Sequence, residues 1–254
     1  MLTLEICTAT LQTASWAASY GAHRIELCEN LAVGGVTPSD ELLQQVLKNA
    51  DIRCHVLIRP RAGDFVYSTR EIDMMIASIH QVKQFGAQGV VIGLLDKNAN
   101  LDEAGLKILC QEATGLSITF HRAIDVAADP LAVLKKLADL GIGYVLTSGA
   151  KPTATVGIPM LTLMQQKFGN QINIMAGGGV NSQTISVIAS QTGIEHFHGS
   201  ARKTSASKLV TLDNQFGISD VASTSVTNAD ADPEEIRRLV SFCENFAFDG
   251  NNNL

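Results

Sequence analysis

Short runs of apolar residues recur along the chain, and most of them end in a cluster of polar or glycine residues. The runs are rich in Val, Ile and Leu, as expected for strands that are buried on both faces of a parallel sheet. Patterns with helical spacing fill most of the intervals between the runs. We therefore predict eight strands that alternate with helices, over residues 2–7, 23–28, 53–59, 89–94, 116–121, 143–148, 172–176 and 194–198.

Signals for helix ends support this alternation. Ser68 and Glu71 have the spacing of a capping box, and Glu235 stands at the same spacing after an aspartate. Gly86 and Gly141 occupy places at which glycine typically ends a helix. A cap residue followed by proline predicts a helix start at Thr37-Pro38, at Asp129-Pro130 and at Asp232-Pro233.

Eight such units favour a closed barrel over an open doubly wound sheet. The open sheet would require a glycine-rich turn after the first strand, and Thr8-Ala9-Thr10 contains no glycine. The chain has 254 residues, and one (β/α)8 barrel typically has about 250. We predict an α/β fold with a single TIM-type barrel domain over residues 1–248 and a flexible tail over 249–254. Residues 202–231 are rich in Ser, Thr, Asn and Asp, and we expect them to form a long loop after the eighth strand.

Composition and charge narrow the functional classes. With 46% hydrophobic and 17% charged residues the chain can bury a large core, and its net charge of −6 argues against nucleic-acid binding. No apolar stretch approaches the roughly 20 residues of a membrane helix, and the N-terminus lacks leader features. We therefore expect a cytoplasmic protein without membrane contact. The five cysteines are an odd number in a long chain without leader features, which argues against a disulfide framework. They include no Cys-x-x-Cys pair, which argues against a closed zinc site.

One doublet ends both of the first two predicted strands. Glu5 and Cys7 end the first strand, and Glu26 and Cys28 end the second. Side chains two residues apart share a strand face, and neighbouring strands lie about 4.8 Å apart, so the two thiols could meet at the barrel mouth. Two thiolates in near-linear reach suit a soft ion such as Cu(I). Alternatively, both cysteines are small buried apolar residues, as free cysteines often are.

The arginines after the third predicted strand are the expected partners of the two glutamates. Arg59 and Arg61 flank a proline, and a buried carboxylate without a partner is costly. Guanidinium groups pair bidentately with carboxylates and phosphates. We expect one arginine to form a structural pair with Glu26 or Asp64, while the other is free to bind a ligand.

The fifth predicted strand ends in a candidate acid–base group. His121 shares a face with Thr119, and Asp125 lies where a loop could bring it back to orient the imidazole. A buried structural histidine is the alternative. The candidate catalytic residues are Glu26, Arg59, His121 and Asp125.

Glycine-rich turns follow the seventh and eighth predicted strands. In TIM-type barrels the loops after these strands often bind phosphate through bare backbone N–H groups. Hydroxyl groups after the sixth strand could add hydrogen-bond donors. The candidate anion-binding residues are Arg61, Ser148, Gly149, Gly177, Gly178, Gly179, His198 and Ser200.

These motifs together resemble the CutC family, whose members are named for copper homeostasis. The resemblance covers roughly Leu4 to Ala201, and the segment after Arg202 matches poorly. Ala62 stands where the family usually has glycine, and Ile124 where it usually has Phe. The motifs that carry the resemblance are Leu4-Glu5-Ile6-Cys7, the segments 21–28, 34–39 and 58–68, Thr119-Phe120-His121-Arg122-Ala123, the segment 145–149, and the segment 175–179.

The resemblance implies a TIM-type barrel, a cytoplasmic location and a role in copper handling. It also implies that Cys7 and Cys28 match family positions proposed to bind Cu(I). Three functional hypotheses follow: a Cu(I)-binding homeostasis protein, an enzyme acting on a small phosphorylated or carboxylated substrate, and a ligand-sensing barrel without turnover. The partner is then a copper ion or a small anionic ligand. A homodimer is a further expectation, because twofold oligomers are common.

Overall fold

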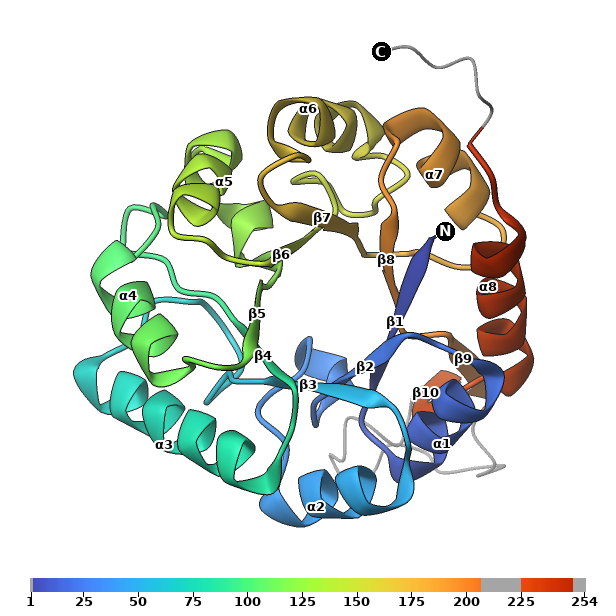
Figure 1. The fold of residues 1–254 in the computed structure, drawn as a ribbon, viewed down its shortest axis with the longest axis horizontal. Helices are drawn as coiled ribbons and strands as arrows, with labels where there is room; N and C mark the ends of the chain where they lie inside the picture. Colours follow the sequence, from blue (N-terminus) through green and yellow to red (C-terminus); the bar gives the residue numbers. More distant parts are fainter. Residues whose placement is uncertain (1, 207–224, 249–254) are drawn as a thin grey trace, which may run out of the picture.

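Eight parallel strands close into a barrel in sequence order (Figure 1). The computed structural model describes residues 2–206 and 225–248, without the side chains of 203–206 and 225–230. The α/β class and the TIM-type barrel predicted from the sequence are therefore confirmed. The barrel strands are β1 (Thr3–Thr8), β2 (Arg24–Leu27), β3 (Arg53–Leu57), β4 (Gly89–Ile92), β5 (Ser117–Phe120), β6 (Tyr144–Thr147), β7 (Asn173–Ala176) and β8 (His196–Gly199).

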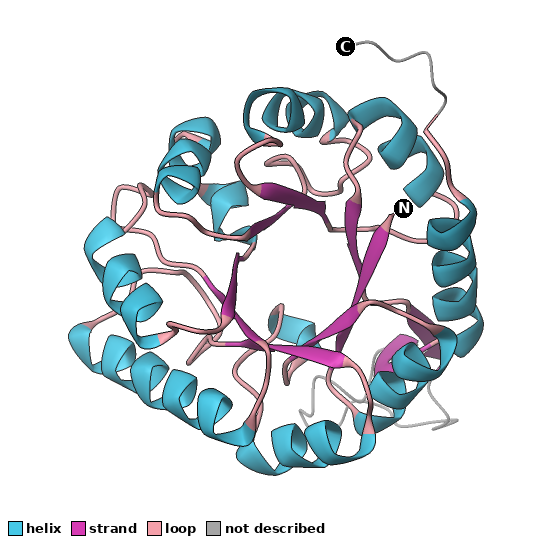
Figure 2. Cartoon of the chain, viewed as in Figure 1, coloured by secondary structure: helices cyan, strands magenta, loops and turns pink. Residues whose placement is uncertain are grey.

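Helices surround the barrel on all sides (Figure 2). Two short 3-10 helices, η1 (Leu31–Val33) and η2 (Arg122–Val126), follow β2 and β5. Among the described residues, no helix has both the length and the apolar character needed to cross a bilayer. The α-helices are α1 (Leu11–Tyr20), α2 (Asp40–Asn49), α3 (Thr69–Phe85), α4 (Glu103–Glu112), α5 (Pro130–Asp139), α6 (Ile158–Phe168), α7 (Ile185–Thr192) and α8 (Pro233–Asn245).

Most predicted helix-start signals are confirmed, with two corrections. The capping box of Ser68 and Glu71 begins α3. Helix α2 begins after Ser39 instead of Thr37, because the Thr37 hydroxyl accepts the backbone N–H of Arg59 and so ties the loop to β3. Glu235 forms no capping box, because its carboxylate instead accepts hydrogen bonds from Ser182 and Arg238.

The segment after β8 differs from the predicted long loop. Its two ends form β9 (Arg202–Ala206) and β10 (Ser225–Ala231), which pair antiparallel as a separate two-stranded sheet. Residues 207–224 and the predicted tail 249–254 lie outside the described residues. Pairing satisfies backbone groups that a loop would have to leave to solvent.

The two faces of the barrel strands have different chemistry. Outward-facing residues such as Ile6, Ile25 and Phe120 are fully buried against the helices and form the main core. TIM-type barrels usually fill their interior with branched apolar side chains. This interior instead contains charged and polar side chains, with one small apolar cluster of Cys7, Cys28, Leu57 and Val91. Alternation along each strand therefore separates an apolar shell from a polar lumen.

Candidate metal centre

The two cysteines of the repeated doublet lie side by side in the lumen. The Sγ atoms of Cys7 and Cys28 are 3.8 Å apart, at the carboxyl ends of β1 and β2. The register of the two strands places Cys7 beside Glu26, and Cys28, directly after the end of β2, is the next luminal residue. Both cysteines are buried, and neither forms a disulfide. The approach predicted from the sequence is therefore present in the structure.

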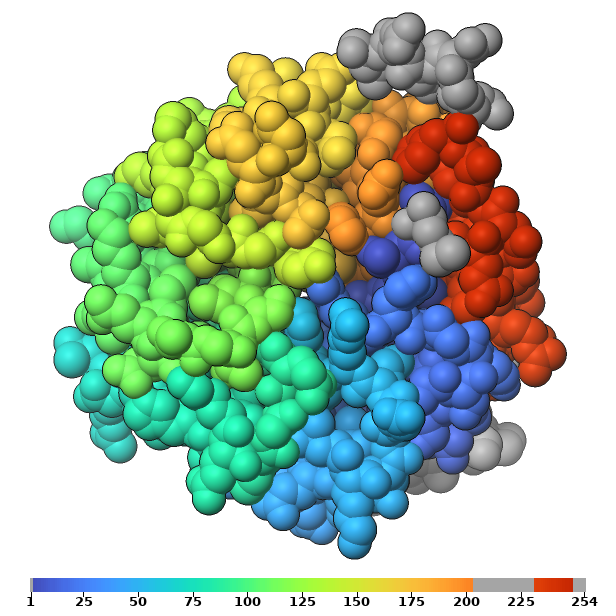
Figure 3. Space-filling view, viewed as in Figure 1, coloured from blue at the N-terminus to red at the C-terminus, as the bar shows by residue number. Residues whose placement is uncertain are grey.

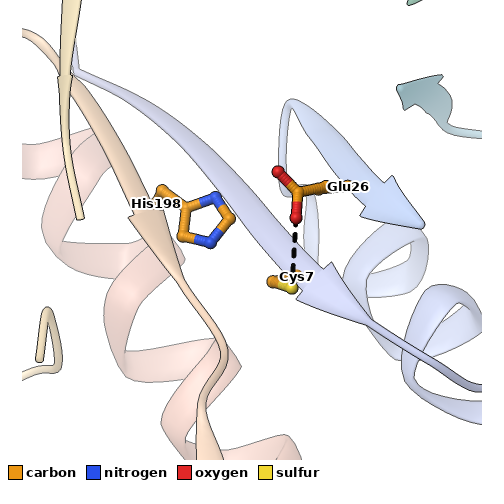
Figure 4. Close-up of side chains that lie close together, drawn as sticks. All are labelled: Cys7, Glu26 and His198. Carbon is orange, nitrogen blue, oxygen red and sulfur yellow. Dashed lines mark hydrogen bonds between the residues drawn. The ribbon is translucent and has the colours of Figure 1, made fainter. Parts of the chain in front are cut away.

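A histidine from the last barrel strand, His198, lies beside Cys7 and Glu26 (Figure 4). Ligand atoms of Cys7, Glu26 and His198 all lie within 4.8 Å of one another. The Cys7 thiol lies 3.6 Å from Glu26 Oε1. His198 comes from β8, which pairs with β1 and so closes the barrel. The sequence assigned His198 to anion binding, whereas the structure places it with the cysteines.

Glu5 forms a hydrogen bond with the ring of His198 and so fixes its orientation. Glu5 Oε1 lies 2.7 Å from His198 Nδ1, and Glu5 Oε2 accepts a 2.5 Å hydrogen bond from Arg24 Nε. The prediction that Arg59 or Arg61 pairs with Glu5 or Glu26 is therefore wrong. The Glu5 partners come from β2 and β8, the two neighbours of β1 in the barrel.

Burial and close charges shift the pKa values of these groups. Burial alone would raise the pKa of Glu5, but Arg24 and His198 lower it to about 2. Burial alone would lower the pKa of His198, but Cys7 and Glu5 beside it raise it well above 6.5. The contact with Cys28, together with burial, raises the pKa of the Cys7 thiol well above 9.0. Burial raises the pKa of Glu26 above 4.5, and its Oε2 has no hydrogen-bond partner.

The donor set fits a soft ion in a bent arrangement. With metal–thiolate bonds of about 2.3 Å, as in zinc sites, sulfurs at this separation enclose a metal at an angle of roughly 110°. A linear S–metal–S unit would need about 4.6 Å between the sulfurs, more than the 3.8 Å observed. The sequence predicted near-linear coordination by the two thiolates. The shorter sulfur–sulfur distance instead favours a bent arrangement, which leaves room for a third ligand. His198 is suited to that role, because a carboxylate bonded to the far ring nitrogen is the usual support of a metal-binding histidine.

A large cavity opens above this cluster at the carboxyl ends of the strands. It has a volume of about 1020 Å³, and we call it the mouth cavity. Its lining includes Cys7 and Glu26 of this cluster, together with glycines such as Gly178 and hydroxyl-bearing residues such as Ser200. Of the sequence candidates, those that line it are Cys7, Glu26, Arg59, His121, Gly178, Gly179, His198 and Ser200.

Both arginines after β3 form hydrogen bonds or ion pairs with residues of nearby loops and helices. The Arg59 Nη atoms donate to the carbonyl oxygens of Val33, Gly35 and Gly63, at 2.7 to 2.9 Å. Arg61 pairs with Glu71, and its remaining N–H groups donate to the loop that includes Asp64. The sequence analysis expected one arginine to pair with either Glu26 or Asp64, and Arg61 pairs with Asp64. Arg61 does not line the mouth cavity, which argues against its predicted role in anion binding.

His121 and Asp125 do not form the predicted acid–base pair. His121 Nδ1 accepts the backbone N–H of Ala123, and its buried Nε2 has no hydrogen-bond partner. Burial and the Arg59 charge lower the pKa of His121 to about 3, so the ring is neutral. Asp125 turns the other way because Arg122 and the backbone N–H of Ser148 donate to it.

The predicted anion residues separate into two groups. Gly178 and Gly179 line the mouth cavity in left-handed backbone conformations, with φ of 91° and 78°. Gly149 and Gly177 instead allow close packing, since an added Cβ would lie 2.5 Å from Gly157 O and 2.4 Å from Leu146 Cδ1 respectively. Ser148 is fully buried and bonds to Asp125, which removes it from the cavity wall.

Three side chains of the cluster and of the cavity lining were not among the site residues predicted from the sequence. Glu5 and Arg24 form the buried pair below the cysteines, and Arg122 lines the mouth cavity beside Gly178. The alternation His23-Arg24-Ile25-Glu26 was the available signal for Arg24, because it places the arginine on the luminal face. The alternation along a strand could not predict the position of the Arg122 side chain, because Arg122 lies in η2, after the end of β5.

Comparisons with known proteins assign the chain to a family. A model described as the CutC family matches residues 2–203. The chain is 45% identical over 199 residues to a protein of Pasteurella multocida named family protein CutC, a match that covers 78% of this chain and 82% of that protein. A Streptococcus agalactiae protein of known structure, provisionally named copper homeostasis protein CutC, gives a TM-score of 0.75 at 31% identity, over 79% of this chain and 99% of that one. The resemblance noted in the sequence motifs is therefore confirmed.

More distant structures share the fold alone. Phosphoribosyl anthranilate isomerase from Thermococcus kodakaraensis gives a TM-score of 0.61 at 11% identity, over 97% of this chain and 100% of that one. At this identity the likeness concerns the barrel and carries nothing about the reaction.

Proposed function

Because this chain belongs to the CutC family, we propose that it serves copper homeostasis by binding Cu(I) between Cys7 and Cys28, with His198 as the third ligand. The observation that carries the proposal is the 3.8 Å separation of the Cys7 and Cys28 Sγ atoms, with a His198 ring nitrogen within 4.8 Å of the Cys7 thiol. Thiolate and imidazole ligands together suit soft and borderline ions. Copper is the cargo in this function.

Protons must leave the site when the ion enters. The raised pKa values of Cys7 and His198 mean that both groups hold a proton near neutral pH. A metal replaces these protons, so its apparent affinity falls as the pH falls. Glu5 stays charged throughout this range and compensates part of the charge of the bound ion.

A competition titration with a chromophoric Cu(I) chelator tests the proposal. We expect Cys7→Ser and Cys28→Ser each to weaken Cu(I) binding by roughly a hundredfold or more. Cys110→Ser, which changes a half-buried cysteine on α4, should bind as the parent protein does. The affinity of the parent should fall by at least about tenfold for each pH unit below neutrality. Equal binding by all three variants would sink the proposal.

The mouth cavity supports a second candidate, the binding of a small organic anion as substrate or effector. Its volume of about 1020 Å³ far exceeds what a bare ion needs and is typical of pockets for small molecules. Arg122 lines it beside Gly178 and Gly179, so a guanidinium and bare backbone groups face the same space. Glu26 and His121 also line it, and Glu26 Oε2 and His121 Nε2 are buried without a hydrogen-bond partner.

Thermal unfolding with ribose 5-phosphate as the probe tests this candidate. A ligand that binds only the folded state raises Tm. We expect a rise for the parent protein that is lost in Arg122→Gln and kept in Arg70→Gln, a variant at an exposed position on α3. A shift of the same size in both variants would remove the mouth cavity as the binding place.

A further inference from the structure

The opposite end of the barrel is also hollow. A second cavity, of about 280 Å³, is lined by the residues with which the strands begin: Thr3, Arg24, Arg53, Ser117 and Tyr144. We call it the N-terminal pocket. It lies at the end where β1 starts, so it is separate from the mouth cavity at the carboxyl ends. Figure 3 shows the surface of the molecule in the same view as Figure 1, with residues from the blue N-terminal part of the chain near the centre of this face.

The N-terminal pocket carries an excess of positive charge. Arg24 and Arg53 are register partners on β2 and β3. Glu5 is the one acidic residue in the lining, and of the two arginines it pairs only with Arg24. Its other oxygen contacts His198, outside this pocket. Arg53 is exposed and has no ion pair among the described residues. Two guanidinium groups on adjacent strands repel each other, and one carboxylate offsets only one of them.

The buried arginine still has donors to offer. Arg24 Nε bonds to Glu5, while Nη2 contacts the Met175 sulfur, a weak acceptor. The guanidinium stacks over the Tyr144 ring, 4.1 Å from its centroid, which fixes its orientation. A guanidinium has five N–H groups, so Arg24 is held in place without being saturated.

A buried histidine adds an unpaired polar atom. His55 is 3% exposed, lines the N-terminal pocket, and its Nδ1 has no hydrogen-bond partner. The ring occupies space that Gly89 leaves open, because a Cβ at Gly89 would lie 2.6 Å from it. Burial and the two arginines oppose the effect of Glu5 and lower the pKa of His55 to about 4, so the ring is neutral.

We propose that the N-terminal pocket binds a small oxyanion, of the size and charge of inorganic phosphate, between Arg24 and Arg53. Arginine forks match the geometry of phosphate and carboxylate oxygens. The neutral His55 ring and the Ser117 and Tyr144 hydroxyls can complete the shell without adding charge. A metal cation is disfavoured despite the nearby histidine and methionine, because both guanidinium groups would repel it.

The proposed phosphate site and the proposed copper site have no ligand residue in common. The N-terminal pocket shares Glu5 with the cluster above, but none of the proposed copper ligands lines it. Cys7→Ser should therefore bind phosphate as the parent protein does, so the two proposals can fail separately.

Isothermal titration calorimetry with inorganic phosphate, at constant ionic strength set by chloride, tests the inference. Arg53→Gln is the informative variant, since Arg53 is exposed and its loss breaks no ion pair in the described chain. We expect phosphate affinity to fall about tenfold or more in Arg53→Gln. Arg70→Gln, which removes the same charge from the exposed surface of α3, should leave it unchanged.

Each other outcome overturns the inference. Equal phosphate binding in Arg53→Gln and Arg70→Gln would show that the pocket is not the site. If phosphate affinity fell in Arg122→Gln and not in Arg53→Gln, the phosphate would bind in the mouth cavity instead. The absence of any measurable phosphate heat in the parent protein would mean that the polar lining serves stability only.

Discussion

At the scale of single residues, the decisive feature is a carboxylate buried between two cationic partners. Glu5 is 1% exposed and touches both Arg24 and His198. Its ion pair with Arg24 faces the N-terminal pocket, and its contact with His198 faces the cysteines. A buried charge of this kind is tolerated only while its partners are present, so Glu5 ties the two ends of the lumen together.

Glu5→Gln should lower the free energy of unfolding by about 3 kcal/mol near neutral pH. The pKa of Glu5 is lowered from 4.5 to about 2 in the folded protein. Its stabilisation is therefore fully present above about pH 4.5 and is lost as the pH falls toward 2. The difference between parent and variant, measured by urea unfolding at several pH values, should shrink over this window.

Glu103→Gln is the control for this prediction, because Glu103 is a solvent-exposed carboxylate paired with Lys107 on the same helix. We expect it to change stability little, since exposed pairs contribute little. A constant difference between parent and Glu5→Gln from pH 7 to pH 3 would contradict the assignment.

At the scale of elements, the loop between β2 and α2 shapes the cysteine pair. Gly35 has φ of 86°, and an added Cβ would lie 2.8 Å from Leu57 Cδ2 and 3.3 Å from Cys28 Sγ. Its carbonyl oxygen also receives Arg59 Nη1. Glycine is thus needed here for both its backbone conformation and its small size.

Gly35→Ala should destabilise the protein by about 2–4 kcal/mol, from the left-handed backbone and from overpacking against Leu57. Gly86→Ala has the same φ of 86° with no atom within 4 Å of the added Cβ, so it isolates the backbone cost of about 1 kcal/mol. Urea unfolding of both variants measures the difference. We also expect Gly35→Ala to weaken Cu(I) binding, and equal losses of stability in the two variants would argue against the close contact.

At the scale of the whole molecule, the barrel closes because β8 returns to β1, through pairs such as Thr3 with His196 and Glu5 with His198. The apolar shell between barrel and helices is continuous and includes side chains from every barrel strand. Unfolding of the barrel is therefore expected to be cooperative. The homodimer and the cytoplasmic location stay predictions.

Phe120→Ala should cost about 3–5 kcal/mol, because Phe120 is fully buried in β5 against the helices. The urea dependence of the unfolding free energy should stay the same, since the same surface is exposed in one transition. Phe248→Ala, at a side chain that is 37% exposed, should cost less than about 1 kcal/mol. A second unfolding transition in Phe120→Ala would show that the shell is not one unit.

The sequence by itself determined the strands and helices of the barrel, their order, and the chemistry that each barrel strand end carries, but not the pairing of β9 with β10. Local signals sufficed for this, because strand alternation and helix caps depend on residues close together in the chain. The doublet of Glu5-Ile6-Cys7 and Glu26-Leu27-Cys28 likewise predicted the thiol pair, because β1 and β2 are neighbours in both sequence and space.

Only the tertiary structure decided which polar groups meet. His198 contacts Glu5, 193 residues away in the sequence, because the barrel closes. Arg24 forms the ion pair with Glu5 that the sequence analysis had expected from an arginine after the third strand. Arg59 donates to carbonyl oxygens of the neighbouring loops, and Arg61 pairs with the carboxylate of Glu71. Asp125 pairs with Arg122 and not with His121. Such choices depend on competing partners at hydrogen-bond distance, and residue spacing along one strand does not encode them.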